Sequence, residues 1–81
     1  MFKIIVKPEA EKELLNAFDW YDSKKNNLAI EFYQEICKTI SYIQDNPDYF
    51  QKRYKDFRIT YTKRFPYGIH YTVENKNIFI H

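Results

Sequence analysis

The sequence predicts an α+β fold in which a helical hairpin packs on one face of a mainly antiparallel sheet. Three observations predict it: a short β-rich run opens the chain, two helical patterns fill the first half, and three alternating runs fill the second. The predicted order is β-α-α-β-β-β, and two helices that share one sheet form a two-layer domain. A chain of 81 residues allows one domain, and 8 Tyr and 7 Phe supply large side chains for its core.

The first two elements are a strand and a helix. Residues 2–7 are rich in β-branched side chains and predict a short strand. Pro8 ends this strand and suits the first position of a helix, where its missing N–H costs nothing. Apolar side chains then recur at helical spacing and predict one buried stripe, made of Ala10, Leu14, Ala17, Phe18 and Tyr21.

A second helix is predicted over residues 27–44, after a polar turn. Asn46 and Pro47 end it, because the residue before a proline disfavours helical backbone. Cys37 lies on this helix and is expected to be a small buried hydrophobe. The stripe expected to face the sheet consists of Ala29, Phe32, Tyr33, Ile36, Ile40 and Ile43.

Three further strands follow, separated by turns. On the first of them, Phe57, Ile59 and Tyr61 are expected to face the helices. On the next strand Tyr67, Ile69, Tyr71 and Val73 are expected to do the same, and residues 77–81 form the last strand. The opposite face of the hairpin would then be polar, with Arg58, Thr60, Thr62 and His70.

Charge is distributed unevenly along the chain. Residues 1–48 contain 6 Lys and 9 Asp or Glu, whereas residues 49–81 contain 7 Lys or Arg and 2 Asp or Glu. The basic second half favours an anionic partner, either nucleic acid or an acidic protein segment, although an ordinary solvated surface is the alternative. The single cysteine excludes an internal disulfide and a C-x-x-C motif, and the absence of a signal sequence or a long apolar run favours a soluble cytoplasmic protein.

Several short motifs occur in a characteristic order. They are Pro8-Glu9-Ala10-Glu11 with Glu13-Leu14, Trp20-Tyr21, Phe32 with 36–40, Asn46-Pro47 with Phe50, Arg58, Phe65-Pro66-Tyr67 with Ile69 and Tyr71, and 78–80. In this order the chain resembles the RelE/ParE superfamily of bacterial type II toxins, also described as plasmid stabilisation proteins. The resemblance implies a single RelE-like βααβββ domain over residues 1–81, and we expect further residues beyond His81 because the last strand pattern stops there.

The resemblance also implies growth inhibition and a cognate antitoxin. RelE-like members cut mRNA in the ribosome, and ParE-like members inhibit DNA gyrase. Arg58 matches one basic position of the nuclease branch, but Thr60 stands where a second lysine is usual and Gly68 where an arginine is expected. The chain is therefore placed nearer the ParE-like branch, as a toxin that acts by binding a target and is neutralised by an antitoxin segment across a groove and the sheet edge.

Two other functions stay open: a ribosome-dependent mRNA endonuclease, and a non-toxic remnant or binding module. For the endonuclease the catalytic candidates are Arg58, His70 and His81, although surface roles for all three are the alternative. No metal site and no cofactor is expected. The candidate contact residues for the target or the antitoxin are Arg58, Lys63, Arg64, His70, Trp20, Lys52, Arg53 and Lys55.

Overall fold

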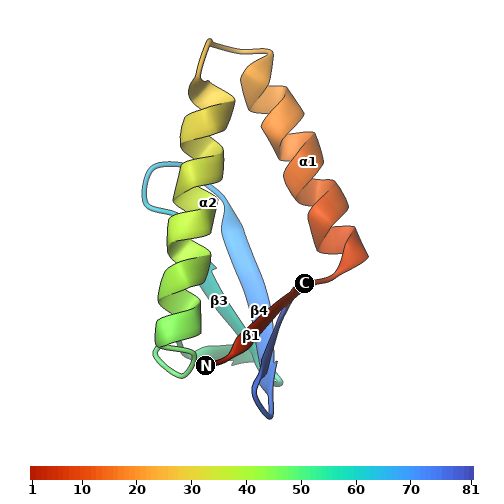
Figure 1. Ribbon diagram of the computed structural model, residues 1–81, viewed down its shortest axis with the longest axis vertical. Coiled ribbons are helices and arrows are strands. Elements are labelled where there is room, and N and C mark those ends of the chain that lie inside the picture. The colour runs from red at the N-terminus through yellow and green to blue at the C-terminus, as the bar shows by residue number, and fades with distance from the viewer.

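The computed structural model describes residues 1–81 and confirms the α+β fold with a helical hairpin on a mainly antiparallel sheet (Figure 1). The two helices converge at the connection between them and diverge towards the sheet. The elements in chain order are β1 (Lys3–Val6), α1 (Pro8–Asp22), α2 (Leu28–Asp45), β2 (Lys52–Tyr54), β3 (Phe57–Tyr61), β4 (Gly68–Glu74) and β5 (Asn77–Ile80).

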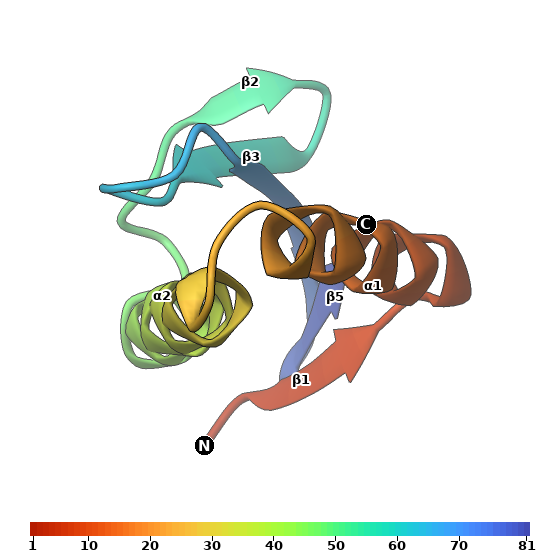
Figure 2. The same cartoon turned by 90° about the horizontal axis from the view of Figure 1, so that it is seen from above.

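The sheet contains five strands in the order β1-β5-β4-β3-β2. The first strand lies parallel to the last, and all other neighbours are antiparallel. Figure 2 shows β1 and β2 at opposite ends of the sheet. The sequence did not reveal β2, because its three residues are all exposed and its pairing with β3 is interrupted by a register shift.

The core is built around one ring on α2. Phe32 is buried, and its ring centroid lies 4.8 Å from that of Tyr21, 5.4 Å from that of Phe65 and 5.3 Å from that of Tyr67. These partners come from α1 and from the turn between β3 and β4. The aromatic cluster therefore joins the helical hairpin to the sheet, and aromatic pairs of this kind contribute about 0.5–1.5 kcal/mol beyond their buried area.

The predicted helical stripes are confirmed except at one position. Ala29, Phe32, Ile36 and Ile43 are buried on α2, and Ile40 is half-buried. Tyr33 was expected in this stripe, but the structure leaves it 60% exposed. One residue beyond Phe32, the side chain is rotated by about 100° around the helix, which turns it away from the sheet.

The two faces of β3 are the reverse of the prediction. Thr60 is only 7% exposed, whereas Tyr61 is 67% exposed. The cause is the register with β4, in which Arg58 lies opposite Tyr71 and Thr60 opposite Ile69, so Arg58 and Thr60 share the helix-facing side of the sheet. The prediction for β4 itself is confirmed, since Ile69 and Tyr71 are buried and His70 is exposed.

Thr60 and Thr62 are both largely buried, but only the hydroxyl of Thr62 has a hydrogen-bond partner in the protein. Thr62 is buried, but its hydroxyl donates to the carbonyl of Phe65 and its N–H donates to the carbonyl of Tyr67 at 3.0 Å. A buried hydroxyl with a partner costs little, while one without a partner costs about 1–3 kcal/mol. The Thr60 side chain makes no hydrogen bond, but its hydroxyl is not sealed from solvent, so it does not carry this cost.

Tyr71 links the sheet to the segment after α2. It is fully buried, and its hydroxyl donates to the carbonyl of Pro47 at 2.9 Å. Burial raises the pKa of Tyr71 to about 12, an effect that Arg58 opposes and Asp48 reinforces. Because the folded-state pKa lies above the ordinary value, the stabilising effect of the neutral phenol is fully present below pH 10 and is lost as the pH rises towards 12.

Tyr71→Phe is expected to lower the free energy of unfolding at pH 7 by about 1 kcal/mol, because it removes a buried hydrogen bond and leaves a carbonyl without its donor. The variant should also lose less stability than the parent between pH 10 and 12. Urea unfolding at pH 7 and pH 11 measures both effects, with the exposed Tyr61→Phe as the control. Equal stability of Tyr71→Phe and the parent at both pH values would contradict the buried hydrogen bond.

No helix combines the length and the apolar character needed to cross a membrane.

Candidate functional site

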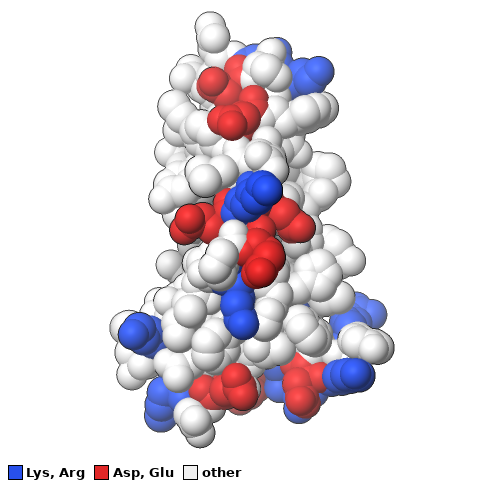
Figure 3. Space-filling model, turned by 90° about the vertical axis from the view of Figure 1, so that its right-hand side faces the viewer, with Lys and Arg blue, Asp and Glu red and all other residues white.

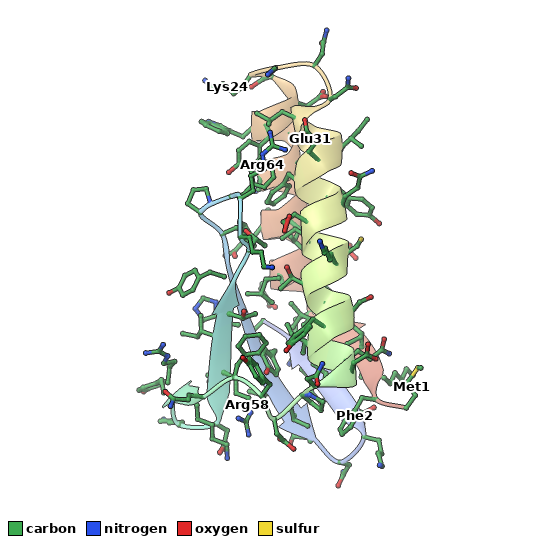
Figure 4. The ribbon with its side chains drawn as sticks, turned by 90° about the vertical axis from the view of Figure 1, so that its left-hand side faces the viewer. Met1, Phe2, Lys24, Glu31, Arg58 and Arg64 are labelled. Atoms are coloured by element: carbon green, nitrogen blue, oxygen red, sulfur yellow. The ribbon has the colours of Figure 1, made fainter.

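Arg58 supports a loop instead of standing free on a polar face. Its side chain on β3 is only 15% exposed, and its guanidinium donates to the carbonyl of Phe50 and to the carboxylate of Asp48 at 3.3 Å. Figure 4 shows Arg58 beneath the segment that follows α2. The guanidinium therefore fixes the connection between α2 and β2, and Asp48 is its ion-pair partner.

Arg58→Ala is expected to lower the free energy of unfolding by about 1.5–3 kcal/mol, because a hydrogen bond made by a charged group is among the stronger ones. Arg53→Ala removes an exposed arginine from β2 and serves as the control, with an expected change within about 0.5 kcal/mol. Thermal unfolding followed by circular dichroism distinguishes them. Equal melting temperatures for the two variants would mean that Arg58 does not hold the loop.

The two histidines lie together on the face of the sheet away from the helices. His81 donates its backbone N–H to the carbonyl of His70 at 2.8 Å, and its ring nitrogen Nε2 lies 2.8 Å from the hydroxyl of Thr72. Its ring also lies 4.8 Å from that of Phe57. Burial lowers the pKa of His81, and the nearby charges of Lys7 and His70 lower it further.

The structure therefore brings two of the catalytic candidates of the endonuclease alternative together, His70 and His81, but not the third, Arg58. Arg58 lies on the helix-facing side, and His70 lies on the opposite face. Gly68 pairs with Tyr61 and shares its face of the sheet. It therefore lies on the face away from the helices, whereas Thr60 lies on the helix-facing side. Thr60 and Gly68 occupy the two positions at which the nuclease branch carries further cations. Side chains at these two positions point to opposite faces of the sheet and could not both reach one phosphate.

The remaining contact candidates are spread over three regions. Arg64, at the β3–β4 turn, pairs with Glu31 on α2, and Figure 4 shows these two side chains pointing toward one another. Lys52 lies 3.5 Å from Asp56 at the β2 end of the sheet. Trp20 is 57% exposed near the far end of the helical hairpin, as expected from its position beside the stripe.

Lys63, Arg53 and Lys55 are exposed and belong to two of these regions. Lys63 lies at the hairpin tip, while Arg53 and Lys55 lie at the β2–β3 turn, where Lys55 has a positive φ of 51°. On the face of the molecule that carries α1, acidic and basic side chains are interspersed (Figure 3).

An apolar groove lies between the two helices, and sequence reasoning did not anticipate it. This interhelical groove has a volume of about 400 Å³ and one charged residue, Glu11. Cys37 is exposed at its margin, which corrects the expectation that it is buried. The sequence signal was the presence of apolar residues outside the predicted stripes, such as Leu15. The lining consists of Val6, Glu11, Leu14, Leu15, Phe18, Tyr33, Ile36, Cys37 and Ile40.

A second hollow lies on the other side of α2, against β3. This α2–β3 cleft also has a volume of about 400 Å³ and is mainly polar and aromatic. It was not predicted, because Thr60 was assigned to the opposite face of the sheet. Its lining consists of Glu35, Lys38, Thr39, Tyr42, Tyr49, Phe50, Thr60, Tyr61 and Lys63.

No family model matches the chain. No curated protein matches it either.

Proposed function

We propose that this chain is the toxin of a bacterial type II toxin–antitoxin system of the RelE/ParE kind. It acts in the cytoplasm by binding a cellular target, in the manner of an inhibitor of DNA gyrase, and a cognate antitoxin neutralises it. The proposal rests on the ordered motifs of the sequence together with a strand, a helical hairpin and a sheet in the corresponding chain order. The structural observation that carries it is the interhelical groove.

The groove has the properties of a site for an amphipathic helix. Leu15 is 59% exposed at its margin, and Tyr33 is exposed at the opposite helix, so apolar surface lies open to water. An occupant that placed apolar side chains at positions i, i+3 or i+4 and i+7 into the groove would bury both. The antitoxin segment is the occupant that this function supplies, and burial of exposed apolar surface favours its binding by about 25 cal/mol per Å².

The choice of binding over mRNA cleavage rests on the environment of Arg58. Cleavage of RNA requires a base and several cations directed at one phosphate. The guanidinium of Arg58 is engaged by Phe50 and Asp48, and the histidines lie on the other face of the sheet. Binding of a target by exposed side chains outside the groove, such as Lys63 at the hairpin tip, requires no such convergence.

Controlled induction of the gene in a bacterium tests the proposed function. A gyrase-binding toxin should stop growth, induce the DNA damage response and cause filamentation. The proposal also predicts a small reading frame that adjoins the gene and encodes the antitoxin, and its co-expression should restore growth. Rapid cleavage of mRNA at codon boundaries would replace the proposal with the endonuclease. Normal growth of cells that accumulate the folded protein would favour a non-toxic remnant or binding module.

A further inference from the structure

We propose that the α2–β3 cleft binds a nucleoside monophosphate, with the phosphate held by lysine side chains and the base stacked against tyrosine. The cleft uses a different side of α2 from the interhelical groove, since Lys38, Thr39 and Tyr42 line the cleft whereas Tyr33, Ile36 and Cys37 line the groove. The site is therefore separate from the surface that carries the proposed function.

A hydroxyl without a protein partner lies at the cleft, on the largely buried residue Thr60. Thr60 is more than nine-tenths buried, lines the cleft and makes no side-chain hydrogen bond, whereas Thr62 and Thr39 donate their hydroxyls to the carbonyls of Phe65 and Glu35. No buried side-chain N or O atom is both sealed from solvent and without a partner, so the Thr60 hydroxyl is reached from the cleft. A ligand oxygen there would complete a hydrogen bond that the protein leaves open.

Two ammonium groups line the same cleft and have no ion-pair partner. Lys38 comes from α2 and Lys63 from the turn after β3, and neither takes part in the salt bridges that engage Lys52, Arg58 and Arg64. Lysine is a compact point charge that binds phosphate, and charge-assisted hydrogen bonds are about twice as strong as neutral ones. A phosphate bound in the cleft would therefore pair with the ammonium groups of Lys38 and Lys63.

The aromatic part of the lining is exposed and ordered by its own packing. The ring centroids of Tyr42 and Tyr49 lie 5.6 Å apart, edge to face, and both rings also pack on Phe50 at 5.9 Å and 5.0 Å. The loop that carries Phe50 is held in turn by Arg58. Stacking of a base on an aromatic side chain contributes about 1–3 kcal/mol.

The size of the cleft and the acceptor group of Glu35 favour a nucleotide over an acidic peptide. Glu35 repels any anion, a phosphate included, but it can accept a hydrogen bond from the exocyclic amino group of a base, a donor that carboxylate side chains lack. The volume of about 400 Å³ falls at the lower end of the range for small-molecule sites. A phosphate joined to one planar base therefore matches the charge, the hydroxyl and the aromatic surface together.

Titration of the ¹⁵N-labelled protein with AMP, GMP, CMP and UMP, followed by NMR, tests the site. At least one nucleotide should shift the amide resonances of Thr39, Thr60 and Lys63, and inorganic phosphate and adenosine should each bind more weakly than that nucleotide. Absence of shifts at the cleft, or equal affinity for inorganic phosphate, would overturn the proposal.

Four substitutions provide matched tests, and the dispersion of the same spectra reports folding. Lys63→Gln should weaken nucleotide binding about tenfold, and Thr60→Val, which keeps the shape of the side chain, about fivefold. Lys76→Gln removes the same charge at the β4–β5 turn, outside the cleft, and should leave affinity unchanged. If Lys76→Gln and Lys63→Gln weaken nucleotide binding equally, the effect of Lys63→Gln is explained by the net charge of the protein, and the proposed site is wrong. Lys38→Gln takes the place of Lys63→Gln if the latter does not fold.

Discussion

Phe32→Ala is expected to lower the free energy of unfolding by about 3–5 kcal/mol, the range found when a buried phenylalanine is replaced by alanine. Phe32 is buried where α1, α2 and the β3–β4 turn meet, and its ring packs against those of Tyr21, Phe65 and Tyr67. The substitution would open a cavity and remove three aromatic contacts at once. A domain of this size has a total stability of roughly 4–12 kcal/mol, so the variant should approach half-unfolding under mild conditions.

Tyr33→Ala is the matched control because it changes the neighbouring aromatic residue of the same helix. Its side chain is mostly exposed, so its replacement should change the free energy of unfolding by no more than about 0.5 kcal/mol. Guanidinium unfolding of both variants, followed by circular dichroism at 222 nm, gives the comparison. Similar losses of unfolding free energy for the two variants would indicate that α2 does not direct Phe32 into the core and Tyr33 towards solvent.

The sequence predicted the order of the elements because each long element has one clear period. Pro8, the stripe that follows it and the Asn46-Pro47 stop are local signals, and they place α1 and α2 to within one residue. The strands β4 and β5 were recognised for the same reason, since Ile69 and Tyr71 alternate with polar residues. Local backbone preference and side-chain period are sufficient where a single face is apolar.

The faces of β3 could not be predicted from its period alone. Phe57, Ile59 and Tyr61 form one apolar row, but Thr60 and Thr62 form a second row that can be buried once a hydroxyl finds a carbonyl partner. Tyrosine, in turn, tolerates exposure because of its polar end. The choice is made by the pairing of β3 with β4, which is a tertiary interaction.

The candidate residues were found one by one, but their grouping was not. Arg58 was identified as a candidate catalytic or contact residue, yet its partners Phe50 and Asp48 lie in a loop whose course no local pattern specifies. The groove and the cleft likewise arise from the apposition of elements that are distant in sequence. Leu15 carried the available signal, because an apolar residue outside a helical stripe can belong to a contact surface, whereas Tyr33 was assigned to the buried stripe.

Leu15→Glu is expected to weaken binding of the cognate antitoxin by at least about 30-fold, if the antitoxin occupies the interhelical groove as proposed. Loss of a central contact in an interface costs about 2 kcal/mol or more, and each 1.4 kcal/mol corresponds to a factor of ten in affinity. The carboxylate would also lie beside Glu11 in an otherwise apolar groove. Folding should be preserved, because Leu15 is exposed and glutamate has nearly the helix propensity of leucine.

Asn16→Glu is the control, since it adds the same charge to the next residue of α1, which is exposed and does not line the groove. Titration calorimetry of each variant with the purified product of the adjoining reading frame measures the affinity, and co-expression measures neutralisation. Cells that produce Leu15→Glu should remain inhibited despite the antitoxin, whereas Asn16→Glu should be neutralised like the parent. Full neutralisation of Leu15→Glu by the antitoxin would mean that the antitoxin binds outside the interhelical groove. If Leu15→Glu is not toxic even without antitoxin, the groove binds the cellular target instead, because the same apolar surface cannot bind both partners at once.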